Sequence, residues 1–168
     1  MIAELIPIPA LAFKKVHFYS VRYEGKADSE FRDFQIRMAE SGHEHELGEI
    51  NRYIDNIGKR FGAYRNHFRD EGAADGLPPP YHQFIESDVP DDYGLRLYCI
   101  RLSPSIVILL NGDRKTQQKA GLCANCKPHF ERANALAKKI TQAILDGDIE
   151  IDEEEKEILV DEDFELTL

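Results

Sequence analysis

The stretch YGLRLYCIRLSPSIVILLNGDRKTQQKAGLCANCKPHFERANALAKKITQAI, residues 93–144, decides how the rest of the chain must fold. It predicts two strands, 95–102 and 105–110, joined by the short turn Ser103-Pro104. The second strand, SIVILL, is apolar without alternation, which indicates a central strand covered on both faces.

The first of these strands alternates. We expect Leu95, Leu97 and Cys99 on one face of the sheet, and Arg96, Tyr98 and Ile100 on the other. A basic loop over 111–119 follows, and then a helix from Pro128 to about Leu145, because proline suits the first helical turn. The helix carries an apolar stripe at helical spacing, made of Phe130, Ala133, Ala137, Ile140 and Ile144.

Before this stretch, the sequence predicts two extended segments followed by two helices. Residues 2–12 are apolar but contain two prolines, which is typical of an edge strand or arm. A strand is expected over 13–23. Helices are expected over 28–40, capped by Asp28 or Ser29, and over 46–61, joined as an αα-hairpin.

Between these helices and the central stretch, EGAADGLPPP predicts a mobile loop, followed by a short strand over 81–85 and a turn over 88–94. The predicted fold class is therefore α+β. It has an antiparallel sheet of about four strands, an N-terminal αα-hairpin and a C-terminal helix, with the helices mainly on one face.

Composition indicates one soluble globular domain. The chain has 168 residues, of which 42% are hydrophobic and 31% charged, and no apolar run approaches the length of a membrane span. The N-terminus lacks the features of a signal peptide. Three cysteines, Cys99, Cys123 and Cys126, do not make an even disulfide framework, so we expect reduced thiols in a cytoplasmic protein without a cofactor.

Charge is distributed unevenly along the chain. The net charge is −10, yet residues 146–168 hold twelve acids and one base, and residues 94–145 hold nine bases and two acids. We therefore expect a body over 1–145 and an acidic C-terminal tail over 146–168. The tail either folds back over the basic surface of this chain or of a second subunit, as a mimic of nucleic acid, or stays solvated. Its apolar residues over 157–160 and 164–166 suffice for a short strand or a docked segment.

The segments LRLYCIR and IVILLNGDRKTQQKA resemble RelE/ParE-type toxins, most closely the HigB-like branch. The resemblance implies a small bacterial toxin held by an antitoxin. Many members cleave mRNA on the ribosome, and others poison DNA gyrase. Arg96 and Arg101 match the two strand arginines of the family, and Lys115 matches a lysine of its loop. Asn111 stands where HigB-like members often have histidine, and Asp113 replaces an apolar or aromatic residue.

Metal-independent RNA cleavage sets three chemical tasks. The 2′-hydroxyl must lose a proton, the phosphorane must be stabilised, and the 5′-oxygen must gain a proton. Arg96, Arg101 and Lys115 suit the second task, since their donors match phosphate oxygens. Tyr98 and His129, with His82 as a further candidate, suit the proton transfers. Strict alternation separates Arg96 from Arg101 unless a bulge intervenes.

Nucleic-acid binding is predicted for two further groups of cations. Arg114 and Lys119 lie in the basic loop. Lys59, Arg60 and Arg65, in a basic run that extends to Arg69, are interleaved with aromatic residues, a pattern that serves both phosphates and bases. The alternative for this second group is the C-terminal end of a helix, where the cations interact favourably with the helix dipole and the aromatic side chains pack into the core.

The pair Cys123-Ala-Asn-Cys126, with His129 three residues on, offers three metal ligands where a structural zinc site uses four. A loop with two thiols is the favoured interpretation, ahead of zinc and of a redox role.

The sequence thus predicts a toxin-like mRNA endoribonuclease, or a degenerate relative, with an antitoxin and RNA or the ribosome as partners. No membrane partner is expected, and the sequence is compatible with a homodimer. The alternative, favoured by Asn111 and Asp113, is a non-catalytic module on the same fold that binds nucleic acid or protein.

Overall fold

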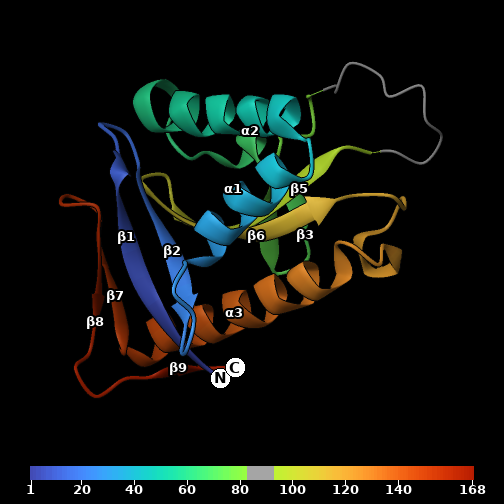
Figure 1. Ribbon diagram of the computed structural model, residues 1–168. Helices are drawn as coiled ribbons and strands as arrows, with labels where there is room; N and C mark the ends of the chain where they lie inside the picture. The colour runs from blue at the N-terminus through green and yellow to red at the C-terminus, as the bar shows by residue number, and fades with distance from the viewer. Residues whose placement is uncertain (83–92) are drawn as a thin grey trace.

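A mixed sheet separates two helical layers in the computed structural model, which describes residues 1–82 and 93–168 (Figure 1). The strands are β1 (Ile2–Ala12), β2 (His17–Tyr23), β3 (Arg69–Glu71), β4 (Ala74–Leu77), β5 (Leu95–Ser103), β6 (Ile106–Arg114), β7 (Ile149–Asp152), β8 (Glu157–Val160) and β9 (Leu166–Thr167). The helices are α1 (Glu30–Glu40), α2 (Glu44–Asn56) and α3 (Lys127–Asp146), with short helical turns at Ile57–Phe61, Arg65–His67 and Ala120–Leu122.

The main sheet has seven strands in the order β3-β4-β5-β6-β2-β1-β9, and β7 and β8 form a separate hairpin. All neighbours are antiparallel except β2 and β6, which run parallel with His17 opposite Ile106 and Tyr19 opposite Ile108. Helices α1 and α2 cover one face, and α3 crosses the other (Figure 1).

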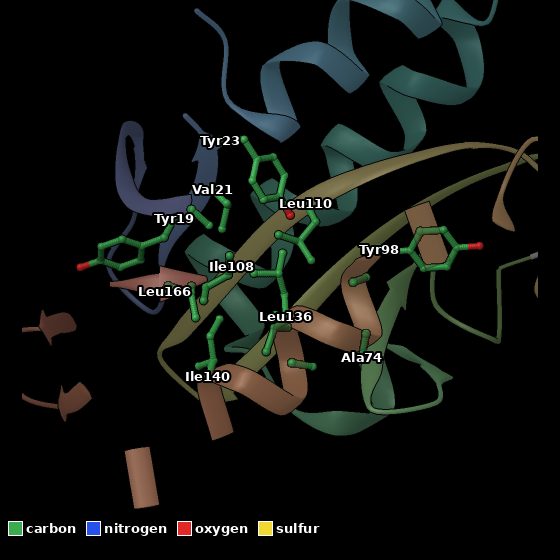
Figure 2. Packing of buried hydrophobic residues seen from close by; sticks show 14 of the residues in the cluster. Tyr19, Val21, Tyr23, Ala74, Tyr98, Ile108, Leu110, Leu136, Ile140 and Leu166 are labelled. Atoms are coloured by element: carbon green, nitrogen blue, oxygen red, sulfur yellow. The ribbon is translucent and has the colours of Figure 1, made fainter. Parts of the chain in front are cut away.

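Strand β6 is central and buried on both faces, as the SIVILL pattern predicts. Ile106, Ile108 and Leu110 pack towards α3, whereas Val107 and Leu109 pack towards α1 and α2. Figure 2 shows Ile108 and Leu110 meeting Leu136 and Ile140 of α3. A strand without polar alternation requires two apolar covers, and here each cover is helical.

The predicted fold class is wrong in three respects. The sheet has seven strands rather than about four, and it is mixed rather than antiparallel. The helical pair is not N-terminal, because β1 and β2, which the patterns over 2–12 and 13–23 do predict, precede it and join the main sheet. The helices lie on both faces rather than mainly on one.

Strand β1 shows how its prolines are accommodated. The Ile2 carbonyl accepts a hydrogen bond from Glu24 N–H on the β2 side, so odd-numbered residues such as Pro7 direct their backbone away from β2. Strand β9 pairs only with Ile2 and Ala3, so Pro7 lacks its N–H on an open edge, where no ladder bond needs it.

Residues predicted as loop and tail supply the remaining strands. EGAADGL, together with Arg69 and Asp70 before it, forms the hairpin of β3 and β4, in which Arg69 pairs with Gly76. The predicted strand over 81–85 and turn over 88–94 fall mostly outside the described residues.

The segment over 146–168 is docked rather than free. Ile149 and Leu166 are buried in the core cluster beneath α3, and Tyr19 Oη donates to the Lys156 carbonyl at 2.9 Å. Its acids form no ion pair with the basic candidates anywhere in residues 1–82 and 93–168. Docking therefore relies on apolar contacts, strand pairing and the hydrogen bonds that Tyr19 and Ser105 donate to Lys156 and Glu153.

Helix ends agree with their sequence signals. Ser29 caps α1 by accepting from Arg32 N–H at 3.1 Å. Pro128 lies in the first turn of α3, and Gly147 ends that helix in the left-handed conformation. Among the described residues, every helix is too short or too polar to cross a membrane.

Candidate active site

Three of the predicted site residues lie together on the α3 face of the sheet, where β5 and β6 meet the basic loop. Arg96 and Tyr98 are buried on β5, and Lys115 follows the last residue of β6. Arg96 Nη1 donates to the carbonyls of Tyr93 at 2.8 Å and Leu95 at 3.1 Å, which fixes the guanidinium. The Lys115 ammonium lies 5.9 Å from the centre of the Tyr93 ring.

The hairpin of β3 and β4 brings Arg69 and Glu71 to the same cluster. Helix α3 holds the turn between these strands, because Ala73 N–H donates to Asn134 Oδ1 at 2.6 Å and Asn134 Nδ2 donates to the Glu71 carbonyl at 2.9 Å. Gly72 has a φ of +79°, and a Cβ there would lie 2.3 Å from Asn134 Oδ1. Only glycine fits this turn, so the clamp depends on it.

Gly76 makes room for the Glu71 side chain. It lies opposite Tyr98 on the neighbouring strand, and a Cβ at this position would come within 2.9 Å of Glu71 Cγ. The carboxylate therefore lies across the surface of β4, towards β5, rather than out in solvent. Glu71 is 9% exposed.

A cavity of about 860 Å³ opens above this cluster. Arg69, Glu71 and Lys115 contribute charges to its wall, and Phe68, Pro80, Leu122 and Phe130 contribute apolar surface. The other residues around it are Asp70, Gly72, Gln118, Lys119, Ala120 and Gly121. The Phe130 ring meets Tyr98 edge-on at 5.9 Å between centroids, so the buried tyrosine lies behind the cavity wall.

Burial and mutual repulsion shift the cations of the cluster towards neutrality. Burial, followed by the charge of Arg69, lowers the pKa of Arg96 to about 10. Burial, with Arg96 as the next cause, also lowers the pKa of Lys115. Burial raises the pKa of Glu71, although Lys115, Arg96 and Arg69 act in the opposite direction. The cluster thus holds three cations and one carboxylate, so its positive charges outnumber its negative charge.

One polar atom beneath the cavity, Arg96 Nε, is buried without a hydrogen-bond partner among the described residues. Tyr98 Oη is also buried there, with the Cys126 thiol as its polar neighbour. Burial strongly raises the pKa of Tyr98, and the nearby Cys126 thiol adds to the effect, so this hydroxyl stays protonated. Unsatisfied buried donors are rare in folded proteins, and they cluster where a ligand completes the hydrogen bonding.

The two cysteines shape the loop that carries Lys115. Cys123 Sγ accepts from Thr116 N–H at 3.3 Å, and the Cys126 thiol donates to the Asp113 carbonyl at 3.7 Å. Burial alone would raise the pKa of Cys123, but hydrogen bonds from Thr116 and Cys126 bring it down to about 7. Burial raises the pKa of Cys126 to about 12.

Arg101 and Arg114 lie on the opposite side of the sheet. The Arg101 guanidinium donates to the Ala63 carbonyl beyond α2, and Arg114 contacts His43 at 2.8 Å and Glu46 at 3.9 Å at the start of α2. The register of β5 and β6 shifts twice. Between Leu97 and Cys99 the extra residue lies on β6, so the alternation along β5 continues, and the second shift, between Arg101 and Ser103, comes too late to bring Arg101 to the face of Arg96.

His129, Asn111 and Asp113 belong to a different polar cluster, centred on Arg37, which we call the Arg37 network. It fills the space where β2 and β6 diverge between α1 and α3. Its contacts are Arg37 to Asp33 (2.9 Å), Asp113 (2.9 Å), Asn111 (2.5 Å) and the Gly112 carbonyl (2.7 Å), and Asn111 to Glu30 (2.5 Å) and Asp33 (2.8 Å). His129 Nε2 lies 4.0 Å from Asp113, and burial lowers its pKa.

The remaining candidates are scattered. Lys119 borders the cavity. Lys59 and Arg65 lie near Asp55 and Asp70 at 4.0 and 3.9 Å, and Arg60 is exposed beside them. His82 contacts Tyr53 at 2.6 Å and Glu49 at 3.2 Å, away from the cavity lining. Within the described ranges, no group of three His, Cys, Asp or Glu side chains is placed to hold a metal, so Cys123, Cys126 and His129 do not converge.

Sequence reasoning missed Glu71, and it placed Arg69 only at the end of the basic and aromatic run, not at the cavity. Both lie in a segment predicted partly as a helix end and partly as a loop. The available signal was the spacing of Glu71, Gly72 and Gly76, which is typical of a tight hairpin with a side chain folded across a glycine.

No family model, curated protein or solved structure matches this chain. Only the chemistry of the site therefore bears on its function.

Proposed function

We propose that the protein is a toxin-like, metal-independent endoribonuclease whose active site is the cavity cluster of Arg69, Glu71, Arg96, Tyr98 and Lys115. The observation that carries the proposal is a buried carboxylate on the wall of a cavity, among three cations, with a raised pKa and with the unsatisfied donor Arg96 Nε beneath it. A phosphodiester in the cavity would supply the missing anion.

Glu71 and Lys115 suit the two proton transfers. The 2′-oxygen attacks phosphorus while Glu71 accepts its proton, and the bond from phosphorus to the 5′-oxygen breaks as Lys115 donates a proton to that oxygen. The products are a 2′,3′-cyclic phosphate and a 5′-hydroxyl. The raised pKa makes Glu71 a stronger base, and the lowered pKa makes Lys115 a stronger acid.

Arg69 and Arg96 suit the stabilisation of the phosphorane. Their charges are held in place before any substrate arrives, because Arg69 Nε donates to the Pro78 carbonyl at 2.8 Å and Arg96 Nη1 is bonded to Tyr93 and Leu95. Preorganised positive charge in a poorly solvated site stabilises a developing anion more than water does.

The test is cleavage of a single-stranded RNA by the purified protein in the presence of a chelator. Wild type should yield fragments with 2′,3′-cyclic phosphate and 5′-hydroxyl ends. Lys115→Ala should lower the rate by about 100-fold or more.

Arg114→Ala is the matched control, since it removes the same charge from the position next in sequence but on the α2 side of the sheet. Equal losses in the two variants would argue against the cavity as the active site. RNA binding without cleavage by the wild type would reject the endoribonuclease and favour a non-catalytic nucleic-acid-binding module.

Growth of bacteria that express the protein tests the biological half of the proposal. Wild type should arrest growth, Lys115→Ala should not, and co-expression of an antitoxin encoded next to the gene should restore growth. Normal growth with wild-type protein at the same level would count against a toxin.

A further inference from the structure

An exposed strip of aromatic rings lies beside the candidate active site. Its members, from α2 outwards, are Tyr53, Tyr81, His67 and Phe61, which we call the aromatic strip. Phe61 stacks on His67 with centroids 4.9 Å apart and planes 15° apart. Tyr81 meets both His67 and Tyr53 edge-on at 6.2 Å.

The rings are ordered by one another rather than by the core. His67 Nδ1 and Tyr81 Oη are 3.0 Å apart, and burial among the rings lowers the pKa of His67, which keeps the imidazole neutral at pH 7. Yet Phe61 is 44% and Tyr81 53% exposed. Large rings fixed in place with open surface are typical of binding sites.

Positive charge flanks the strip. Arg60 directly precedes Phe61, and Arg65 lies two residues before His67, whereas the Lys59 ammonium lies over the Phe13 ring at 5.2 Å. The Arg65 side chain is 74% exposed, and its 3.9 Å contact with Asp70 is a surface ion pair that holds it weakly. Rings for bases beside cations for phosphates match a single strand of nucleic acid better than they match an apolar peptide.

The strip is continuous with the cavity through two segments of chain. Phe68 and Arg69, directly after His67, lie on the cavity wall, and Pro80, directly before Tyr81, lies there too. From His67 to Glu71 the extended chain covers roughly 13 Å. A strand with its scissile phosphate at Glu71 therefore has neighbouring nucleotides within reach of the rings.

We infer that the aromatic strip is a base-stacking subsite for single-stranded RNA, which holds nucleotides next to the one cleaved in the cavity. The inference rests on the proposed function for its ligand class. It adds that recognition depends on unpaired bases, because a ring can stack only on a base that is free of a duplex partner.

Binding measurements with an RNA that cannot be cleaved separate the two claims. We would use fluorescence anisotropy with a short 2′-O-methyl RNA and with an abasic strand of the same backbone. Wild type should bind the strand with bases more tightly. Phe61→Leu and Tyr81→Leu should each weaken that binding about fivefold or more, and should leave the abasic strand unaffected.

Two controls test the roles of charge and of general exposure. Arg65→Ala should weaken both strands and lower the slope of log K against log salt by about 0.7. Leu159→Ala, which removes an exposed apolar side chain from β8, should change neither. Thermal unfolding of each variant checks that the fold persists.

Equal affinity of wild type for the two strands would overturn the inference, and so would unchanged binding in both leucine variants. Loss of a protein partner's binding in Phe61→Leu, with RNA binding intact, would assign the strip to that partner instead and would also overturn it. Base-dependent binding without any cleavage of natural RNA would support the subsite and remove the proposed chemistry alone.

Discussion

The cavity cluster and the Arg37 network are both dense in charge, but they differ in how that charge is satisfied. In the Arg37 network, the central guanidinium donates to Asp33, Asp113, Asn111 and the Gly112 carbonyl. In the cavity cluster, Arg96 Nε has no partner among the described residues, and the surrounding pKa values are shifted towards neutral forms.

This difference indicates which of the two polar clusters has the character of a functional site. A network whose donors and acceptors match, such as that of Arg37, stabilises the packing of α1 against β6. A cluster with excess cations and a buried donor that lacks a partner lowers the stability of the fold. Such clusters are retained where they bind a ligand. Asn111 and Asp113, which depart from the toxin pattern in sequence, belong to the first kind.

The largest expected effect is on catalysis. Glu71→Gln should reduce RNA cleavage by about 100-fold to 10,000-fold, because it removes the proton acceptor with little change in shape. Asp70→Asn is the control, since Asp70 is the neighbouring residue in β3 and its side chain is 95% exposed. Similar losses in both variants would show that the general charge of this hairpin matters, rather than the Glu71 carboxylate. Initial rates at saturating RNA provide the measurement.

The next effect is on stability. Arg37→Met should lower the free energy of unfolding by about 3 kcal/mol, because it leaves Asp33, Asn111 and Asp113 without their shared donor. Arg32→Met, on the exposed side of the same helix, should change it by less than about 0.5 kcal/mol. Urea unfolding measures both. If Arg37→Met folds but no longer cleaves RNA, the Arg37 network also contributes to activity, and the proposed division between the two regions is wrong.

A smaller effect is expected at Cys123. Cys123→Ala removes the sulfur that accepts from Thr116 N–H, so we expect a loss of about 1 kcal/mol in stability and a several-fold loss in cleavage as Lys115 becomes less fixed. Cys99→Ala, buried on the opposite face of β5, should cost stability without a specific loss of activity. If both variants lose cleavage only in proportion to stability, the thiol does not position Lys115.

The smallest effect is the opposite response of the two regions to pH. Since the pKa of Glu71 is raised, its protonated form stabilises the fold, and this stability is lost as pH rises through the folded pKa. Glu71→Gln should therefore be more stable than wild type at neutral pH, and the gain should vanish in acid below the ordinary pKa of a glutamate.

In the Arg37 network the sign is reversed. Burial lowers the pKa of His129 from 6.5, so its contribution is present above pH 6.5 and is lost as pH falls through the folded value. Burial alone would raise the pKa of Asp33, but hydrogen bonds from Asn111 and Arg37 lower it below 3.8, so its contribution is lost only in stronger acid. Urea unfolding of wild type and His129→Gln across this range checks the sign. A difference that grows above pH 7 would contradict it.

Local patterns predicted the parts of the fold that depend on near neighbours. The alternation of Leu95 to Ile100 and the continuous apolar run of β6 locate these strands and their buried faces. The helical stripe of α3 is equally local, with Ala133, Ala137 and Ile140 all buried.

The rest depends on partners far along the chain. Strands β3 and β4 have three and four residues, too few for alternation to appear, and β4 gains its second neighbour only from β5. The parallel pairing of β2 with β6 leaves no local mark at all. Arg96, Tyr98 and Lys115 were found because they lie in the patterned stretch, whereas Glu71 was missed because its position depends on the short hairpin.

The parallel pair of β2 and β6 also has a consequence for synthesis. Ser20 Oγ donates to the Leu109 carbonyl across 89 residues of chain, so the first strands and helices wait for β6 before their apolar faces are covered. At roughly 5–20 residues per second, the ribosome takes roughly 5–20 s to deliver it. Asn134 of α3, which clamps the Glu71 turn, comes later still. A nascent chain therefore carries no assembled cavity, and the cell meets the finished site only when most of the protein has been made.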